Sequence, residues 1–128
     1  MRQVTAAVII EDGRLFLARR SAGDPLAGMW ELPGGKVEPG ETAPECLERE
    51  LFEELAMISE VGPELARTIY HYTHGSFEMI ALATLRMSDY EPSVHDATCW
   101  ARKEEFARMD LAPADVELIR ELLRTGML

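Results

Sequence analysis

Residues 42–55 carry the pattern of one amphipathic helix, and this stretch constrains the fold more than any other. Thr42 followed three residues later by Glu45 matches a capping box, in which the side chain of each residue binds the backbone of the other. At 100° per residue, leucines that recur every four positions fall within an arc of ~80°. They are Leu47, Leu51 and Leu55. This apolar stripe must face a core.

An acidic face adjoins the apolar stripe. Glu50, Glu53 and Glu54 share it, and like charges three or four residues apart destabilise a helix by roughly 0.2–0.5 kcal/mol per pair. One interpretation is a solvated surface, helped by Arg49, which lies four residues from Glu45 and from Glu53. The other is a divalent-cation site, because carboxylates and the carbonyls of the preceding Gly-Gly loop are the hard oxygen ligands that Mg²⁺ or Mn²⁺ prefers. The loop favours the second interpretation, and with it a phosphorylated substrate.

The charge balance argues against some partners. The 128 residues contain 23 Asp and Glu against 13 Lys and Arg, which gives a formal net charge of −10. Nucleic acids and anionic membranes attract proteins with a surplus of basic side chains, so neither partner is expected. With 47% hydrophobic residues and no repeat or linker, residues 1–128 are expected to form one domain. A monomer and a homodimer both remain open.

Cysteine usage and the first residues indicate a cytoplasmic protein. Cys46 and Cys99 lie far apart without companions at metal-ligand spacing, so we expect two free thiols rather than a disulfide. The segment MRQVTAAVII lacks the basic region and long apolar stretch of a signal peptide. No run approaches the ~18 apolar residues that a membrane span needs.

The remaining segments predict an α/β fold with a mixed sheet between helices. Asp12-Gly13 is a hairpin signal between two antiparallel strands, and Pro113 and Gly126 are typical of the start and the end of a last helix. The expected strands are residues 3–10, 14–20, 29–33, 58–74, 77–87 and 97–101. The expected core stripe of the last helix is Val116, Ile119, Leu122 and Leu123.

Residues 35–57, GKVEPGETAPECLERELFEELAM, resemble the Nudix signature G-x5-E-x7-R-E-U-x-E-E-x-G-U, where U is a bulky aliphatic residue. The matching positions are Gly35, Glu41, Arg49, Glu50, Leu51, Glu53, Glu54 and Met57. Ala56 replaces the second glycine, so it either adopts a left-handed conformation at roughly 1–2 kcal/mol or the loop turns differently. The order of the expected elements resembles the Nudix α/β/α sandwich over essentially the whole chain.

This resemblance implies Mg²⁺- or Mn²⁺-dependent hydrolysis of a nucleoside diphosphate linked to another moiety. By position, Glu50, Glu53 and Glu54 would hold the metal together with the carbonyl of Gly34. Arg49 would orient the glutamates by charge-assisted pairs. Glu53, Glu50 and Arg49 are therefore the implied catalytic residues.

Two further residues bear on the implied mechanism. Glu41 would help to hold the loop. In the related triphosphate hydrolases a glutamate commonly lies six residues before a tryptophan and acts as general base, but here that position is Val94. Nearby substitutes are Glu91, His95 and Asp96. A glutamate of the signature could also serve, and Glu53 is our choice.

The segment MWELPGGK and Arg20 resemble the MutT-type branch, which hydrolyses nucleoside triphosphates to monophosphate and pyrophosphate. The resemblance implies substrate contacts from Arg20, Leu32 and Gly35. Leu32 is equally compatible with a plain core position. Alternatives to this activity are hydrolysis of a dinucleotide or nucleotide sugar, and a catalytically silent nucleotide-binding regulatory domain.

Residues 111–119, LAPADVELI, resemble the CTP pyrophosphohydrolase subgroup. Asp115 stands where the 8-oxo-dGTP sanitisers have asparagine. An ionised carboxylate only accepts hydrogen bonds, so it favours a base edge that donates, such as the amino group of cytosine or adenine. Asp115 could instead complement the dipole of the last helix. CTP, dCTP or a modified cytidine triphosphate is thus the favoured substrate, and 8-oxo-dGTP is the next.

Overall fold

Two β-sheets form the centre of the fold in the computed structural model, which describes residues 1–128. The elements in chain order are β1 (Arg2–Val8), β2 (Ile10–Glu11), β3 (Arg14–Arg20), β4 (Trp30–Glu31), α1 (Ala43–Leu55), β5 (Ser59–Tyr72), β6 (Gly75–Arg86), β7 (His95–Ala101), a 3₁₀-helix (Lys103–Arg108) and α2 (Pro113–Arg124). One sheet has the order β1-β6-β5, with β1 parallel and β5 antiparallel to β6. The other is antiparallel and joins β2, β3, β4 and β7.

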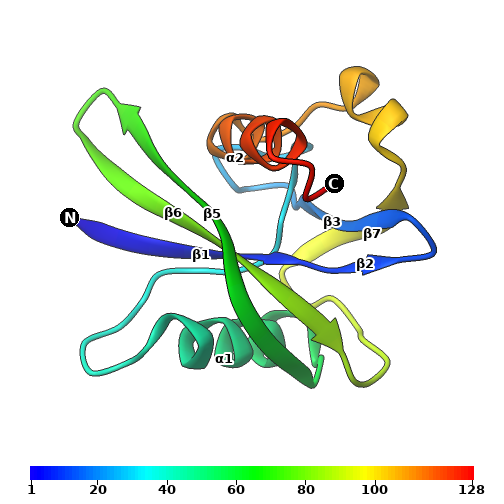
Figure 1. Cartoon of the computed structure of the whole chain (residues 1–128), viewed down its shortest axis with the longest axis horizontal. Helices are drawn as coiled ribbons and strands as arrows, with labels where there is room; N and C mark the ends of the chain where they lie inside the picture. Colours follow the sequence, from blue (N-terminus) through cyan, green and yellow to red (C-terminus); the bar gives the residue numbers. More distant parts are fainter.

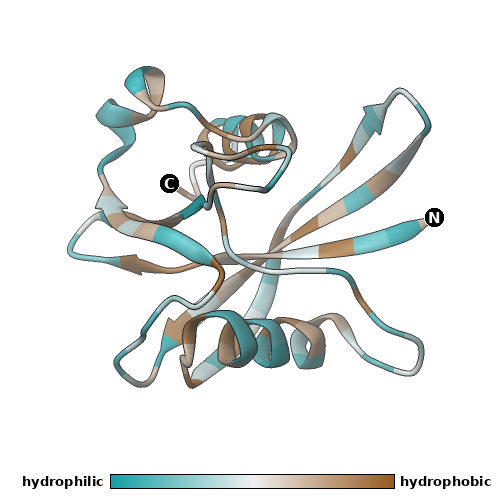
Figure 2. Ribbon diagram, turned by 180° about the vertical axis from the view of Figure 1, so that it is seen from behind, coloured by the Kyte–Doolittle hydropathy of each residue, from teal (hydrophilic) through white to brown (hydrophobic).

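The mixed sheet lies between the two helices, as Figure 1 shows, so the predicted fold class is confirmed. Successive side chains of a strand point to opposite faces. Along β6, Met79 and Ala81 therefore pack toward α2, whereas Ile80 and Leu82 pack toward α1. Around α1 in Figure 2, hydrophobic and hydrophilic segments alternate, as expected for a helix that buries one side.

The predicted first hairpin is partly wrong. The apolar run at residues 3–10 does not remain one strand, because β1 ends at Val8 and pairs in parallel with β6 in the mixed sheet. Only β2 forms the hairpin with β3, around Asp12 and Gly13. The buried side chain of Ile9 lies at the point where the chain passes from one sheet to the other. Two sheets, rather than one, thus share this run.

Helix α1 begins as its sequence predicts, and its end takes one of the two conformations considered for Ala56. The hydroxyl of Thr42 accepts from the Glu45 amide at 3.2 Å, and the Glu45 carboxylate accepts from the Thr42 amide at 2.9 Å. Leu47, Leu51 and Leu55 are fully buried. Ala56 adopts the left-handed conformation at φ 50° and ψ 30°, which is the strained alternative. At 13 residues, α1 is the longest helix. Neither α1 nor α2 reaches the length and hydrophobicity that a membrane-spanning helix needs.

The buried stripe of α2 differs from the prediction. Leu118, Ile119 and Leu122 are buried, but Leu123 is 39% exposed. Asp115 is also buried, at 4% exposed, on the same side of the helix. The predicted free thiols are confirmed, with Cys46 buried and Cys99 half-buried.

Candidate active site

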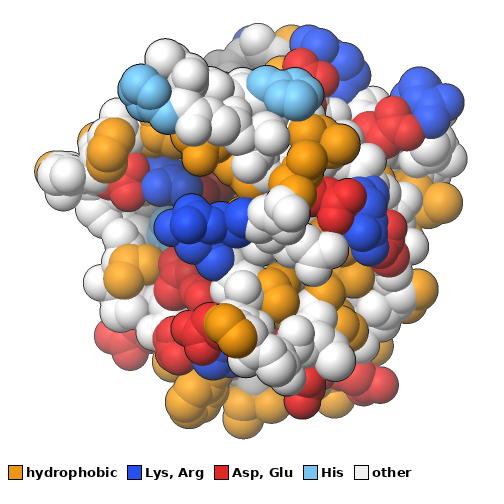
Figure 3. All heavy atoms as spheres, turned by 90° about the vertical axis from the view of Figure 1, so that its left-hand side faces the viewer, with side chains coloured by type: hydrophobic (Ala, Val, Ile, Leu, Met, Phe, Trp, Pro, Cys, Tyr) orange, Lys and Arg blue, Asp and Glu red, His pale blue; other side chains and the backbone are white.

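A cavity of about 880 Å³ opens beside the edge of the mixed sheet where β1 begins. Its wall combines residues from β1, the loop after β4, α1 and the start of α2. Figure 3 looks at the N-terminal end of the molecule, where basic side chains at the centre lie next to acidic ones. Among the predicted site residues, the cavity wall includes Arg20, Leu32, Gly34, Gly35, Glu50, Glu54 and Asp115.

The segment Pro33 to Gly35 runs along β1. The amide of Ala7 donates to the carbonyl of Pro33 and the amide of Thr5 donates to the carbonyl of Gly35, each at 2.8 Å. In extended backbone successive carbonyls point in opposite directions, so the Gly34 carbonyl between them points away from β1. It accepts no hydrogen bond. The predicted carbonyl ligand is therefore available.

Both glycines of this segment are required by close contacts. A Cβ at Gly34 would lie 2.0 Å from the carbonyl oxygen of Thr5. A Cβ at Gly35 would lie 2.4 Å from the Cδ atom of Glu50 and 2.6 Å from both of its carboxylate oxygens. Because Gly35 has no side chain, the carboxylate of Glu50 in α1 rests directly against the loop. Gly35 thus positions Glu50.

Arg49 connects the acidic side chains. Its Nε and Nη2 donate to the two carboxylate oxygens of Glu41 at 2.7 and 2.9 Å, and its Nη1 donates to Glu50 at 2.9 Å and to Glu53 at 3.3 Å. Its Nη2 also donates to the carbonyl of Lys36 at 3.3 Å, which ties the loop to the helix. The Arg49 hydrogen bonds, with one from the backbone of the loop, lower the pKa of Glu41 to about 2.

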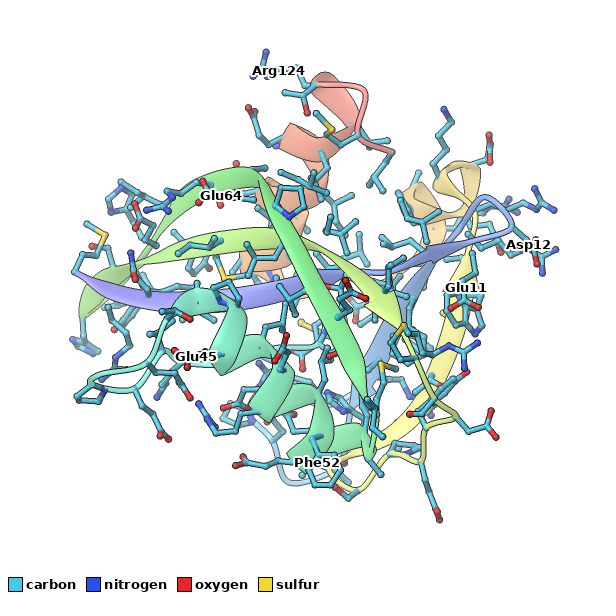
Figure 4. All side chains as sticks on the ribbon, turned by 60° about the horizontal axis from the view of Figure 1, so that its bottom comes forward. Glu11, Asp12, Glu45, Phe52, Glu64 and Arg124 are labelled. Carbon is cyan, nitrogen blue, oxygen red and sulfur yellow. The ribbon has the colours of Figure 1, made fainter.

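The three signature glutamates occupy different environments. The side chain of Glu53 is 56% exposed, whereas that of Glu50 is 16% exposed. Burial, and then the neighbouring Glu50 carboxyl, raise the pKa of Glu54 to about 8. Phe52, in the same turns of α1, is 62% exposed and lies on the outer side of the helix in Figure 4. Of the three glutamates, Glu50 and Glu54 line the cavity, and Glu53 lies outside its wall.

This donor set fits a divalent cation. Two carboxylates crowd at Glu50 and Glu54, and the free Gly34 carbonyl lines the same cavity. All are hard oxygen donors, which Mg²⁺ and Mn²⁺ prefer. Because Glu50 and Glu53 are turned toward Arg49, no three acidic, histidine or cysteine side chains converge on one point.

A second polar group on the wall was missed by the sequence analysis. The carboxylate of Glu31 accepts from Arg20 at 2.8 Å and contacts the ring Nε2 of His95 at 2.9 Å. Arg20 also donates to Asp24 at 3.0 Å, so its guanidinium is compensated by two carboxylates. Glu31 lies inside the segment MWELPGGK, and its position between two apolar residues was the available signal.

The candidate substitutes for a general base are not equivalent. Val94 is 52% exposed on the cavity wall. His95 also lines the cavity, but its Nε2 is engaged by Glu31 and its Nδ1 is buried without a partner. Asp96 instead pairs with Arg19 at 2.7 Å, and Glu91 lies outside the wall.

The part of the cavity wall nearest α2 is mainly apolar and includes the buried Asp115, and we call this part the apolar slot. Its walls are Val4, Leu32, Phe77, Met79 and Ala114, with Tyr72 at the rim. The Oδ1 of Asp115 accepts from the Leu32 amide at 2.9 Å. Burial, and then the nearby Glu31 carboxylate, raise the pKa of Asp115 to about 8. The carboxyl therefore tends to hold its proton at neutral pH.

Comparison with known proteins identifies the family. A family model described as NUDIX domain matches residues 5–121. The chain is 38% identical over 127 residues to the CTP pyrophosphohydrolase of Escherichia coli (strain K12), covering 96% of this chain and 92% of that protein. It is 41% identical over 126 residues to the 8-oxo-dGTP diphosphatase of Haemophilus influenzae (strain ATCC 51907 / DSM 11121 / KW20 / Rd), covering 94% and 90%.

Comparison with solved structures supports the same family. The solution structure of the E. coli ORF135 protein has a TM-score of 0.87 at 35% identity, covering 97% of this chain and 89% of that chain. The crystal structure of a MutT protein from Methanosarcina mazei Go1 has a TM-score of 0.85 at 28% identity, covering 98% and 94%. The chain therefore belongs to the NUDIX domain family and is a Nudix hydrolase of the MutT type.

Proposed function

We propose that this Nudix hydrolase cleaves a nucleoside triphosphate to a nucleoside monophosphate and pyrophosphate with Mg²⁺ or Mn²⁺, and that CTP, dCTP or a modified cytidine triphosphate is its favoured substrate. One observation carries the proposal. The cavity combines an oxygen-donor cluster at Gly34, Glu50 and Glu54 with an apolar slot that includes Asp115. The first suits a polyphosphate bound as a metal complex, and the second suits a flat base.

The side chains of α1 supply the chemistry at the phosphates. Glu50, Glu53 and Glu54, with the Gly34 carbonyl, would hold the cation, which when bound neutralises phosphate charge and lowers the pKa of water. Arg49 keeps Glu50 and Glu53 aligned through its hydrogen bonds. Glu53, the most exposed of the three, takes a proton from the attacking water. The bond between the first and second phosphates breaks, and no covalent enzyme intermediate forms.

The protonation of Asp115 refines the reasoning about the base. A neutral carboxyl donates one hydrogen bond and accepts others, whereas an ionised one only accepts. The pKa of about 8 therefore favours a base edge with an acceptor beside a donor. Cytosine offers this pair in its ring N3 and its 4-amino group. The similarity to the E. coli CTP pyrophosphohydrolase supports the same substrate.

The other predicted substrate contacts have distinct roles. Leu32, 3% exposed, forms a wall of the slot and presents its amide to Asp115. Gly35 acts through the space that it leaves for Glu50. Arg20, already paired with Asp24 and Glu31, would meet the nucleotide only by giving up part of these pairs.

An oxidised purine nucleotide is the second candidate. The same neutral carboxyl suits 8-oxoguanine, whose O6 accepts and whose N7 carries a hydrogen. The similarity to the H. influenzae 8-oxo-dGTP diphosphatase supports this alternative. Both candidate substrates are free nucleotides. We propose that the enzyme acts on them in the cytoplasm as a single-domain monomer or homodimer, and that it binds neither nucleic acid nor a membrane.

A metal-dependent product assay tests the proposal. CTP, dCTP, ATP, dGTP, 8-oxo-dGTP and ADP-ribose are each incubated with enzyme and MgCl₂ or with EDTA, and monophosphate and pyrophosphate are quantified. We expect release from a triphosphate only with Mg²⁺. Glu53→Gln should lower kcat by about 10²-fold or more, whereas Glu48→Gln, an exposed residue of the same helix, should leave it unchanged. No turnover of any triphosphate would refute the activity.

The base assignment is tested separately. Asp115→Ala should lower kcat/KM for CTP more than for the poorer substrates, because the lost contacts are specific to one base edge. An unchanged ranking of substrates would remove Asp115 from base recognition without affecting the proposed reaction.

A further inference from the structure

Most of the basic side chains are already paired with acids. Seven of the 13 Lys and Arg residues form salt bridges, namely Arg19, Arg20, Arg49, Arg67, Arg86, Arg120 and Arg124. Of the cations outside these pairs, two line the cavity, Arg2 and Lys36. In a chain of net charge −10, cationic side chains without acidic partners in the cavity wall indicate a site that binds a negatively charged group.

The register of β1 determines the face of the sheet on which the side chain of Arg2 lies. Gln3 pairs with Glu78 of β6, and the two side chains are hydrogen-bonded at 3.0 Å on one face. Arg2 and Val4 therefore lie on the other face, beside Phe77, which pairs with Arg2. This face of the sheet lines the apolar slot, to which Val4 and Phe77 belong. The unpaired guanidinium of Arg2 thus lies at the end of a surface that is otherwise apolar.

The distance from the acidic cluster is also set by β1. Thr5 is bonded to Gly35, against which the Glu50 carboxylate rests. Arg2 lies three residues before Thr5, or roughly 10 Å along the strand at ~3.3 Å per residue. The long side chain can cover part of this span. The guanidinium is exposed and forms no hydrogen bond or salt bridge with the protein.

We propose that Arg2 is a phosphate-binding residue of this enzyme, which contacts the polyphosphate of the substrate at the mouth of the cavity and favours triphosphates over monophosphates. This inference rests on the proposed nucleotide substrate. A planar guanidinium binds phosphate oxygens with two parallel hydrogen bonds, which an ammonium group does not reproduce. Arg20 does not compete for this role, because Asp24 and Glu31 already occupy its guanidinium.

Binding and kinetics of three variants test the role. Arg14 supplies the matched control, because it is exposed, forms no salt bridge and lies on β3 outside the cavity wall. Calorimetry measures binding of inorganic pyrophosphate in the presence of Mg²⁺ by the wild type, Arg2→Ala, Arg2→Lys and Arg14→Ala. We expect Arg2→Ala to weaken binding by about 5- to 10-fold, Arg2→Lys to restore part of it, and Arg14→Ala to match the wild type.

Steady-state kinetics add a second readout. KM for the preferred triphosphate should rise by a similar factor in Arg2→Ala with kcat nearly unchanged, and KM of this variant should depend less on salt. Inhibition by the nucleoside monophosphate should change less than twofold. Equal effects of Arg2→Ala and Arg14→Ala on pyrophosphate binding would overturn the inference, as would an equal loss for monophosphate. A wild type that binds pyrophosphate but hydrolyses no triphosphate would instead overturn the proposed function.

Discussion

Replacing Asp115 by asparagine removes a group whose charge is costly in the folded protein. Asp115 is 4% exposed, lines the apolar slot and accepts one hydrogen bond from the Leu32 amide. Asparagine has nearly the same shape, and its oxygen can accept the same bond. The substitution therefore changes the titration of the site while keeping its packing.

The structure gives the size and the sign of the effect. Burial raises the pKa of Asp115 from 3.8 to about 8, and each pKa unit corresponds to 1.36 kcal/mol. The difference between folded and unfolded states amounts to roughly 6 kcal/mol in a dry site. Water in the open cavity screens part of it, so we expect about 2–3 kcal/mol. Because the folded pKa is raised, this contribution to stability is complete below about pH 4 and is lost as the pH rises toward 8.

Urea unfolding of the wild type and Asp115→Asn at pH 5, 7 and 9 measures this difference. The free energy of unfolding of the variant, relative to that of the wild type, should increase from pH 5 to 7 and from pH 7 to 9. At pH 9 the variant should be the more stable protein. Asp110→Asn, at an exposed carboxylate, should show no such trend. A free-energy difference between wild type and Asp115→Asn that is the same at all three values would refute the reasoning, because the carboxyl would then titrate alike in both states.

Three further substitutions test the geometry of the site and of α1. Gly35→Ala should lower kcat/KM by about 10²-fold, because its Cβ displaces the Glu50 carboxylate, while Gly62→Ala, whose Cβ meets nothing closer than 3.4 Å, should not; equal activities would contradict this. Ala56→Gly should raise the free energy of unfolding by about 1 kcal/mol in urea titrations, since φ is 50° there, and a decrease would be evidence against strain. Arg49→Lys should lower kcat by about 10-fold or more despite keeping the charge, because the two-pronged carboxylate contacts are lost; full activity would exclude an orienting role.

The sequence was most informative where a local rule acts within a few residues. The capping box and the leucine stripe of α1 depend on side chains three or four positions apart, so the pattern from Thr42 to Leu55 predicts them directly. The sequence was less informative for residues 3–10, because whether such a run forms one strand or passes between two sheets depends on distant partners. The same holds for α2, where the buried side includes Asp115 instead of Leu123.

The candidate site shows the same division. The spacing of Arg49, Glu50, Glu53 and Glu54 on one helix places these side chains together before any tertiary structure is known. Other contacts of the site join residues that lie far apart in the chain, as the bond between the Leu32 amide and Asp115 does. Glu31, one residue away from Leu32, was missed for this reason.

The sequence by itself determined the family signature, the start of α1 and the face that carries its glutamates, because a helix fixes the relative directions of side chains through local geometry. Only the tertiary structure decided which charges are compensated. It pairs Arg20 with Asp24 and Glu31, leaves Arg2 free at the mouth of the cavity, and buries Asp115 so that its pKa rises to about 8. Burial and ion pairing depend on segments that meet only after folding, and the sequence order alone does not contain those distances.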